Sequence, residues 1–521
     1  GASYIEGTRG NYRDDKGSFT YGEKEIYFLK SVETKTHVAN FNTTARYDGL
    51  EAYRKLASYY DNTTRKGMKA LTSISLYTKE ATKDHLNPPI KVVHFCYKYA
   101  LCQGSGNSDA NRGAKLTLDK VYFTYQRSDR GKLSAYKFGY GDINSGSDNP
   151  NYNLNDMDRW GSFKSNYANY GDLISGHYPY LDFPYTEQEE DKAPTIPSRV
   201  AQWSLKQIDL PTGGTIKIKY ESDDYAYVEN KKAAHMFDIV SIGEEPTSIP
   251  ARTATPTTID ATEAPDGNGN YKVYFKLEKS LNGMLPADRT SYMQQHVQDV
   301  GRMYFKTYAE LTPGNFDYVT GYANTIECGW LRDDIGYVVI QAVNLKKYSI
   351  AGQIVNPFTK AAIQHLRISR SELIFPQSVA GSGMNAIFGL FEAAGTAIND
   401  LMSMIQGFNT WAYMKNYGRK IMLNGRSVIR LTDPDGIKYG GGIRVAQLSI
   451  SDNWDATNQD ISSTSTGARE YGQKYDYKIN EGGRVISSGV AYEPVTGNDE
   501  NALRTPVEYE ESTLLGTASD M

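Results

Sequence analysis

The 521-residue sequence has little cysteine and almost no charge imbalance. Its 57 lysines and arginines face 61 aspartates and glutamates, which gives a formal charge of -4, and neither sign forms long blocks along the chain. Nucleic acids and anionic membrane surfaces select clustered cations, so neither is expected as a partner.

The three cysteines, Cys96, Cys102 and Cys328, do not identify a redox compartment. Cys96 and Cys102 fall in one expected strand, where a separation of six residues places their sulfur atoms roughly 20 Å apart. A bridge between these two would need an intervening turn, whereas either one can pair with Cys328 and leave a single thiol. The disulfide state is therefore open.

Motifs for catalysis, cofactors and metals are also scarce. The sequence has no Gly-x-Ser-x-Gly elbow and no Walker-type loop, and its seven histidines lack the spacing of a metal-ligating pair. Residues 381–386 form an incomplete dinucleotide fingerprint, with Pro376 shortly before it and no acid at the usual distance after it. Residues 142–148 offer oxygen ligands for calcium but lack the full twelve-residue loop. We expect no enzyme, no cofactor and no metal, and assign no catalytic residue.

Two further polar features have simple interpretations. The acidic run at residues 187–191 lies between Pro184 and Pro194 and is interpreted as a solvated loop. Asn42 and Asn62 begin glycosylation sequons, which matter only in a secretory pathway that reads them.

Tyrosine is abundant, and its pattern predicts the fold class. The chain has 41 tyrosines and 47 glycines, only 39% hydrophobic residues and a mean hydropathy of -0.56. In residues 121–125 and 474–479 aromatic and polar residues alternate, which places rings on one face of a strand and polar groups on the other. We predict a mainly β protein of multi-stranded antiparallel sheets, shell-like or sandwich-like, with one long amphipathic helix inserted.

Turn residues between alternating segments predict hairpins. The clearest joins residues 202–210 to 215–220 across the turn 211–214, and a second joins 120–126 to 135–140. The segment 53–60 is interpreted as a short helix. Further strands are expected at residues 25–29, 92–97, 271–277, 303–308, 336–345, 427–431, 442–451, 473–479 and 484–490.

Two helices are expected after residue 350. Asn356 and Pro357 form a good helix start, followed by helix over residues 360–372. In residues 384–408 apolar side chains recur mostly at intervals of three and four, and Glu392 and Asp400 are the segment's charges. We interpret this long helix as packed under or inside a β shell; a membrane-active segment or an oligomer contact are the alternatives.

Composition divides the chain into four expected regions. They are a Tyr-rich β region (1–243), a linker followed by a β region (244–350), a helical insertion (351–418) and a β region with a single YD-like element (419–521). The linker is the segment 244–266, which is dense in Thr, Pro and Ala. Both ends of the chain lie in polar stretches, so we expect a fragment of a longer polypeptide.

Several stretches resemble very large surface or secreted proteins of Bacteroidota that are distantly similar to RHS/YD-repeat proteins. The YD element is represented once, by Tyr475, Asp476 and Tyr477 followed by Gly483 and Arg484, with the Tyr-Asp pair expected to help turn a hairpin. The other stretches that carry the resemblance are residues 28–39, 115–125, 158–161, 210–214, 220–227, 439–445 and 486–494.

The resemblance implies a structural and extracellular role. It implies strands that wind into a shell. It also implies that the chain is exported to the cell surface or outer membrane by the type IX route, and that its partner is the remainder of a longer polypeptide. We therefore expect a non-enzymatic scaffold segment of a giant surface protein. The alternatives are a glycan-binding adhesin, with Trp160 and Trp454 as sugar platforms and surface glycans or surface proteins as partners, and a glycoside hydrolase.

Overall fold

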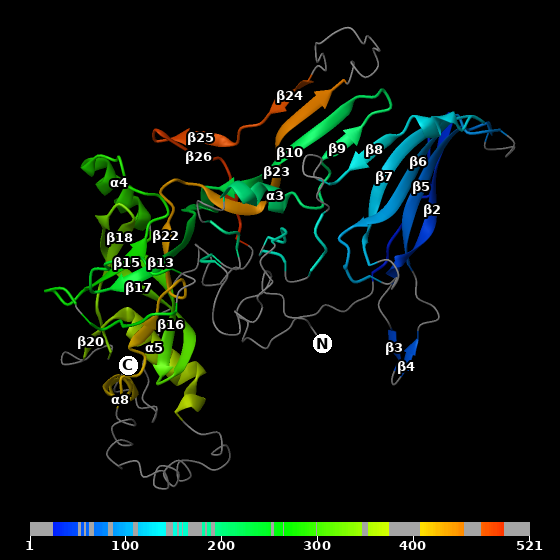
Figure 1. Ribbon diagram of the computed structural model, residues 1–521. Helices are drawn as coiled ribbons and strands as arrows, with labels where there is room; N and C mark the ends of the chain where they lie inside the picture. The colour runs from blue at the N-terminus through cyan, green and yellow to red at the C-terminus, as the bar shows by residue number, and fades with distance from the viewer. Residues whose placement is uncertain are drawn as a thin grey trace. The chain divides into compact units, whose positions relative to one another are not determined.

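The fold is mainly β, with several antiparallel sheets and only short helices in the described residues (Figure 1). This confirms the expected class. The computed structural model describes residues 24–50, 54–56, 59–61, 67–81, 87–107, 113–141, 149–153, 156–158, 160–164, 180–182, 185–188, 193–251, 255–263, 265–298, 300–345, 353–374, 407–452 and 470–493.

The chain forms two compact units, each assembled from separated segments. Unit 1 comprises residues 1–165, 195–222 and 442–476, and unit 2 comprises residues 166–194, 223–441 and 477–521. The chain therefore passes from one unit to the other after residues 165, 194, 222, 441 and 476. The four regions expected from composition are continuous in sequence, and that division stays a prediction.

A sheet of ten strands dominates unit 1, and most of its strands follow one another along the chain. The predicted hairpins are confirmed, since β7 pairs with β8 and β9 pairs with β10, both antiparallel. The order across the sheet is β1 (Ser31–Glu33), β2 (His37–Leu50), β5 (Gly67–Thr78), β6 (Lys91–Leu101), β7 (Lys115–Tyr125), β8 (Tyr136–Gly139), β9 (Gln207–Asp209), β10 (Thr215–Tyr225), β23 (Lys438–Ser451) and β24 (Glu470–Lys474).

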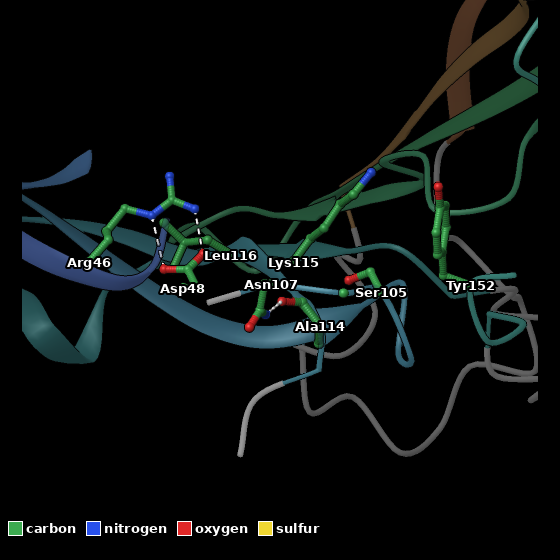
Figure 2. A pocket seen from close by; sticks show the side chains of 9 residues that line it. Arg46, Asp48, Ser105, Asn107, Ala114, Lys115, Leu116 and Tyr152 are labelled. Carbon is green, nitrogen blue, oxygen red and sulfur yellow. Dashed lines mark hydrogen bonds and ion pairs between the residues drawn. The ribbon is translucent and has the colours of Figure 1, made fainter. Parts of the chain in front are cut away.

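The central strands of this sheet are mostly half-buried. In β6 only Val92 is buried, and in β7 only Thr117 and Thr124. Rings therefore meet across strands near the surface: His94 stacks on Tyr122 at 4.5 Å between centroids. A pocket opens beside β2 and β7 (Figure 2).

Two expectations for unit 1 are wrong. Residues 53–60 do not form a helix, because β3 (Arg54–Leu56) and β4 (Tyr59–Asp61) pair as an antiparallel hairpin. Residues 25–29 form no strand, and β1 begins only at Ser31. The short 3-10 helix Arg130–Leu133 lies between β7 and β8, and α3 (Ile196–Val200) precedes β9.

In unit 2, six antiparallel strands close into a ring. Each strand pairs with two neighbours in the order β16, β17, β18, β15, β13 and β22, and β22 pairs again with β16. Ile429 of β22 lies opposite Phe237 on one side and Phe305 on the other. The strands are β13 (Ala234–Ile242), β15 (Tyr271–Lys276), β16 (Arg302–Thr312), β17 (Asn315–Arg332), β18 (Ile335–Ile340) and β22 (Val428–Thr432).

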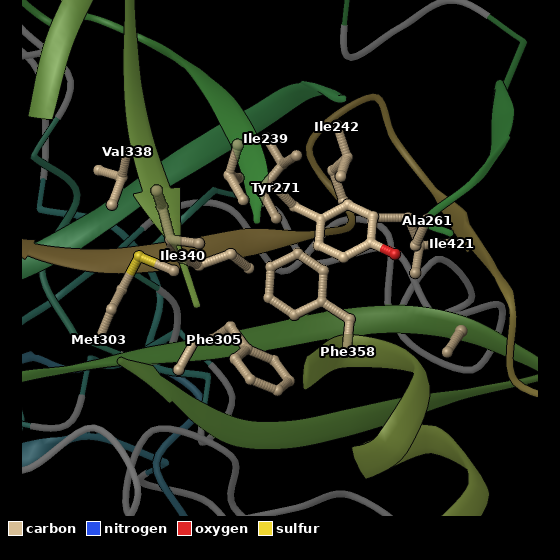
Figure 3. Close-up of a cluster of buried hydrophobic side chains, with 14 of the residues drawn as sticks. Ile239, Ile242, Ala261, Tyr271, Met303, Phe305, Val338, Ile340, Phe358 and Ile421 are labelled. Atoms are coloured by element: carbon tan, nitrogen blue, oxygen red, sulfur yellow. The ribbon is translucent and has the colours of Figure 1, made fainter. Parts of the chain in front are cut away.

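Alternation along the ring strands builds the core of unit 2 (Figure 3). In β16, Met303 and Phe305 belong to the main apolar cluster, whereas Tyr304 between them belongs to another cluster with Met236. This is the two-residue period of a strand with both faces covered. Phe305 packs edge-on against Phe358 of α5, 4.5 Å between ring centroids.

Short helices complete this core. The prediction for α5 (Pro357–Ser369) is confirmed: the Asn356 side chain accepts a hydrogen bond from the Phe358 amide, and Pro357 occupies the first turn. Helix α4 (Pro286–Val297) was not predicted, and it buries Met293 and His296. The predicted long helix lies outside the described residues up to position 406, and Phe408 begins the short α8 (Phe408–Met414).

Part of the expected linker belongs to the folded core. Within residues 244–266, Thr258–Asp260 form β14, which pairs with β21 (Lys420–Met422). Ala261 is fully buried, and its carbonyl accepts a hydrogen bond from the Asn356 side chain. The remaining elements of unit 2 include β11 (Tyr227–Val228), β12 (Lys231–Lys232), β19 (Val343–Asn344), β20 (Ile354–Val355) and the 3-10 helix Ser371–Leu373.

The YD-like segment does not turn a hairpin. Tyr475, Asp476 and Tyr477 separate β24 from β25 (Lys478–Glu481), so the expected single strand at 473–479 is wrong. The hairpin between β25 and β26 (Arg484–Ser487) turns instead at Gly482 and Gly483, which both have positive φ. After it, β27 (Val490–Ala491) pairs in parallel with β11.

Candidate functional site

Unit 2 contains a group of buried charged residues, which we call the buried charge cluster. Most of its members come from segments far apart in the sequence. They lie at residue 182, in strand β13, after β15, between β22 and the start of β23, and after β27. They are Asp182, His235, Glu278, Asp433, Lys438 and Glu493.

His235 lies at the centre of the cluster. Its Nδ1 is 3.1 Å from an oxygen of Glu278, and its Nε2 is 3.9 Å from Oδ1 of Asp433. Burial alone would lower the pKa of His235, but the carboxylates of Glu278, Asp433 and Asp182 hold it well above its usual range. His235 is therefore an imidazolium at neutral pH.

The pKa values of the two aspartates beside His235 are shifted in opposite directions. Burial raises the pKa of Asp182 to about 7, although His235 and Lys438 oppose the shift. Burial also acts to raise the pKa of Asp433, but His235 and the backbone amides of Asp435 and Ile437 hold it below the usual range. Asp182 therefore titrates near neutral pH while Asp433 stays ionised.

Lys438 and Glu493 form a second ion pair in the cluster. Nζ of Lys438 lies 2.8 Å from Oε1 of Glu493, and the two side chains are only 3% and 1% exposed. The same Nζ donates to the carbonyl of Ala234 at 2.7 Å. The rings of Tyr185 and Tyr225 lie 5.1 and 5.8 Å from Nζ.

Neighbouring polar side chains bind the main chain of distant segments. The Gln188 side-chain amide donates to the Tyr439 carbonyl at 2.9 Å and accepts from the Tyr439 amide at 2.8 Å, as a strand neighbour would. Ser487 donates to the carbonyl of Asp224 at 3.0 Å. Glu187 and Gln188 are buried, so the solvated-loop interpretation is wrong for the start of the acidic run.

A second buried histidine lies next to the cluster. His296 of α4 contacts the ring of Phe237 at 5.4 Å, and His235 contacts the same ring at 4.6 Å. Burial among these rings lowers the pKa of His296 to about 4, so it is neutral at physiological pH. The fold thus keeps His235 protonated and His296 neutral, although both histidines contact the ring of Phe237.

A pocket of about 290 Å³ adjoins the cluster through Asp433. Its polar walls are already engaged with one another: the Tyr227 hydroxyl donates to Glu481, and Lys232 donates to Gln298. Arg484 also donates to Gln295. The remaining lining residues are Ala226, Thr432, Pro434, Gly436, Gly482 and Ile486.

Unit 1 has a larger pocket of about 450 Å³ (Figure 2). Arg46 and Asp48 on β2 form a two-bond ion pair, with Nη2 2.6 Å from Oδ2. Lys115 on β7 lies over the ring of Tyr152, 5.6 Å from its centroid. Polar planar groups and an aromatic ring are therefore exposed to one pocket.

Among the residues that the structure describes, Trp160 and Asn42, singled out from sequence alone, do not belong to the buried charge cluster. Trp160 is half-buried beside Asp158, whose carboxylate accepts from the amides of Trp160 and Ser162. Asn42 lies in β2 and donates to Ser73. Residues 142–148 and 381–386, together with His85, His177, Asn62 and Trp454, lie outside the described residues.

Metal ligands do not converge in the part of the chain that the structure covers. No group of three or more His, Cys, Asp or Glu residues there is arranged to hold an ion. All three cysteines are free; Cys102 and Cys328 are buried. Within the same described ranges, no helix has the length and apolar composition needed to cross a bilayer.

Sequence reasoning missed the buried charge cluster. Apart from Asp433 and Lys438, which are five residues apart, its members are separated by tens to hundreds of residues, and a pattern of local spacing cannot bring them together. Comparison with protein-family models finds no match, and comparison with curated proteins finds no similar sequence.

Proposed function

We propose that this chain is a non-enzymatic structural segment of a giant exported cell-surface protein, an RHS-like shell or scaffold. The observation that carries the proposal is the use of charged and amide side chains in unit 2. Lys438 binds the Ala234 carbonyl and Glu493, and Gln188 binds both backbone groups of Tyr439. These groups hold distant chain segments together, which is the requirement of a scaffold.

The ten-stranded sheet supports the same proposal. Its half-buried strands offer two broad faces with tyrosine rings near the surface, as a wall or a display surface would. In the proposed arrangement the sheets form part of a shell, and the rest of a longer polypeptide continues it. Export to the surface by the type IX route belongs to the same proposal.

Surface labelling of the organism that encodes the chain tests this function. Antibodies against the purified chain should bind intact cells, and protease added to intact cells should release fragments of it. A cytoplasmic protein labelled in parallel is the control. Labelling that requires cell lysis would reject the surface scaffold.

A second candidate, a glycan-binding adhesin, is favoured by the unit 1 pocket. Sugars bind where polar planar groups surround an aromatic ring, and Arg46, Asn107 and Tyr152 supply such groups. A glycan array probed with the chain should then give signals that Tyr152→Ala abolishes. Tyr136→Ala, in β8 outside the pocket, is the matched control. An array without signals would remove this candidate.

A further inference from the structure

Lys438 and Glu493 are held in a geometry that favours chemistry between them. Lys438 begins β23, and Glu493 follows β27, so the pair joins two segments of unit 2. Nζ is 2.8 Å from Oε1, and its bond to the Ala234 carbonyl fixes it in place. The nucleophilic atom is therefore hydrogen-bonded to an oxygen of the carboxyl group that it would attack.

The surroundings of this pair exclude water. Both side chains are almost completely buried, and Tyr185 and Tyr225, themselves buried, place their rings around Nζ. Two charges in such a site pay a large desolvation penalty that their attraction only partly offsets. A reaction that removes both charges is favoured by the same burial.

We propose that Lys438 and Glu493 condense into an intramolecular amide bond. A proton passes from Nζ to Oε1 along their hydrogen bond, and the neutral amine attacks Cδ of Glu493. The new C–N bond forms, the bond from Cδ to Oε1 breaks, and Oε1 leaves as water with two protons from the nitrogen. The ammonium and the carboxylate become one amide and one water, so no oxidant, reductant or cofactor is needed.

Tyr225 is placed to assist the second proton transfer. Its hydroxyl donates to Oε1 of Glu493 at 3.3 Å. It can pass its proton to the leaving oxygen and recover one from the nitrogen. Burial and the nearby Glu493 carboxylate raise the pKa of Tyr225 well above its usual range, so the hydroxyl stays protonated and keeps its hydrogen bond to Oε1. Tyr225 is thus a positioning and relay residue.

Fixed reactants shift this condensation toward the amide. Groups held in place within a fold react as if at roughly 10⁵–10⁸ M, far above the concentration of water that would hydrolyse the product. The amide would close a covalent loop over residues 438–493, which restricts the unfolded chain as other cross-links do. This inference goes beyond the scaffold function, which surface labelling tests separately.

Intact mass spectrometry of the full chain tests the proposal. The mass should be lower than the sequence mass by one water molecule, and digestion should release a branched peptide that joins Lys438 to Glu493. Tyr225→Phe should slow the appearance of this species in freshly purified protein. A mass equal to that of the sequence, in aged protein that remains folded, would overturn the proposal.

Two variants identify the source of any water loss. Lys438→Arg keeps the positive charge but presents a poor nucleophile, so its mass should equal the sequence mass. Lys279→Arg alters a largely exposed ion pair with Asp435 and should retain the full water loss. Water loss in Lys438→Arg as well would place the reaction elsewhere, for example at an aspartate, and would also overturn the proposal.

Discussion

The two units stabilise their strands by different means. Strands β6 and β7 of unit 1 are mostly half-buried, whereas in β16 of unit 2 only Arg302 and Glu310 are not buried. Unit 1 joins rings across its surface, and unit 2 encloses an apolar core and a charge cluster. The same tyrosine-rich composition thus supports both an open sheet and a closed ring, and burial of apolar side chains distinguishes them.

The largest expected contrast compares two phenylalanines. Phe305→Ala removes a fully buried aromatic side chain from the interior of the six closed strands of unit 2 and should lower the free energy of unfolding by about 3–5 kcal/mol. Phe123→Ala, in the half-buried β7, should cost less than about 2 kcal/mol. Urea denaturation followed by circular dichroism measures both. Equal losses would contradict the contrast between the units.

A second contrast compares two ion pairs. Compared with the chain in which Lys438 and Glu493 are still an ion pair, Lys438→Met leaves Glu493 buried without its charge partner and should destabilise unit 2 by about 3–5 kcal/mol. Lys98→Met breaks a pair with Asp119 whose side chains are 51% and 38% exposed, and should cost less than about 1 kcal/mol. Thermal unfolding of both variants gives the comparison. A similar loss of stability in the two variants would show that the buried ion pair stabilises the fold no more than the exposed one.

The charge cluster should also make unit 2 sensitive to pH. The pKa of Asp182 is about 7 in the folded chain, against an ordinary value of 3.8, so the folded state retains a proton that the unfolded state releases. His296, whose pKa is about 4 in the folded chain against an ordinary value of 6.5, makes stability rise with pH between these values. Asp182 acts in the opposite direction: alone it should make stability fall as pH rises from about 4 to 7, by at most about 4 kcal/mol. The raised pKa of His235 acts in the same direction, since its contribution is lost as pH rises through that pKa.

Asp182→Asn should remove the Asp182 contribution, because the amide does not titrate, so stability should rise with pH relative to the parent protein. Urea midpoints measured between pH 4 and 8 give the slope. Asp129→Asn, at a largely exposed position in unit 1, is the matched control and should leave the slope unchanged. If Asp182→Asn follows the parent protein at every pH, the carboxyl is not held protonated.

The smallest expected effect concerns the surface rings of unit 1. Tyr122→Leu removes the stacking on His94 and should cost about 1 kcal/mol. Tyr471→Leu, on the exposed strand β24, should have almost no effect. Denaturation with a probe in unit 1 tests the pair. A loss above about 3 kcal/mol at Tyr122 would mean that this sheet depends on a packed core after all.

The sequence predicted local structure where one short motif decides it. The Asn356 cap with Pro357 gave the start of α5, and the turn at 211–214 gave the hairpin of β9 and β10. The sequence-based prediction was wrong where no short motif distinguishes a helix from a strand. The Tyr-rich, charged segment 53–60 is interpreted as a short helix, yet Arg54–Leu56 and Tyr59–Asp61 are strands. Helix α4 was missed because few of its residues are apolar.

The candidate site could not be predicted in the same way. Lys438, Glu493 and Ala234 meet only because β13, β23 and the segment after β27 pack together. Each residue is ordinary in its own sequence context. Long-range packing brings them together, and no local pattern of charge or spacing records it. The Tyr-Asp pair is the opposite case: a recognisable local motif predicted a hairpin turn, but the turn lies at Gly482 and Gly483 instead.

The repeated passage of the chain between the two units has a practical consequence. Since the path changes unit after residues 165, 194, 222, 441 and 476, no single truncation yields a fragment that holds one whole unit and nothing of the other. Expression of unit 2 alone would require its three segments to be rejoined by designed connections. Partial proteolysis that nicks the chain once should likewise leave both halves associated until a denaturant separates them.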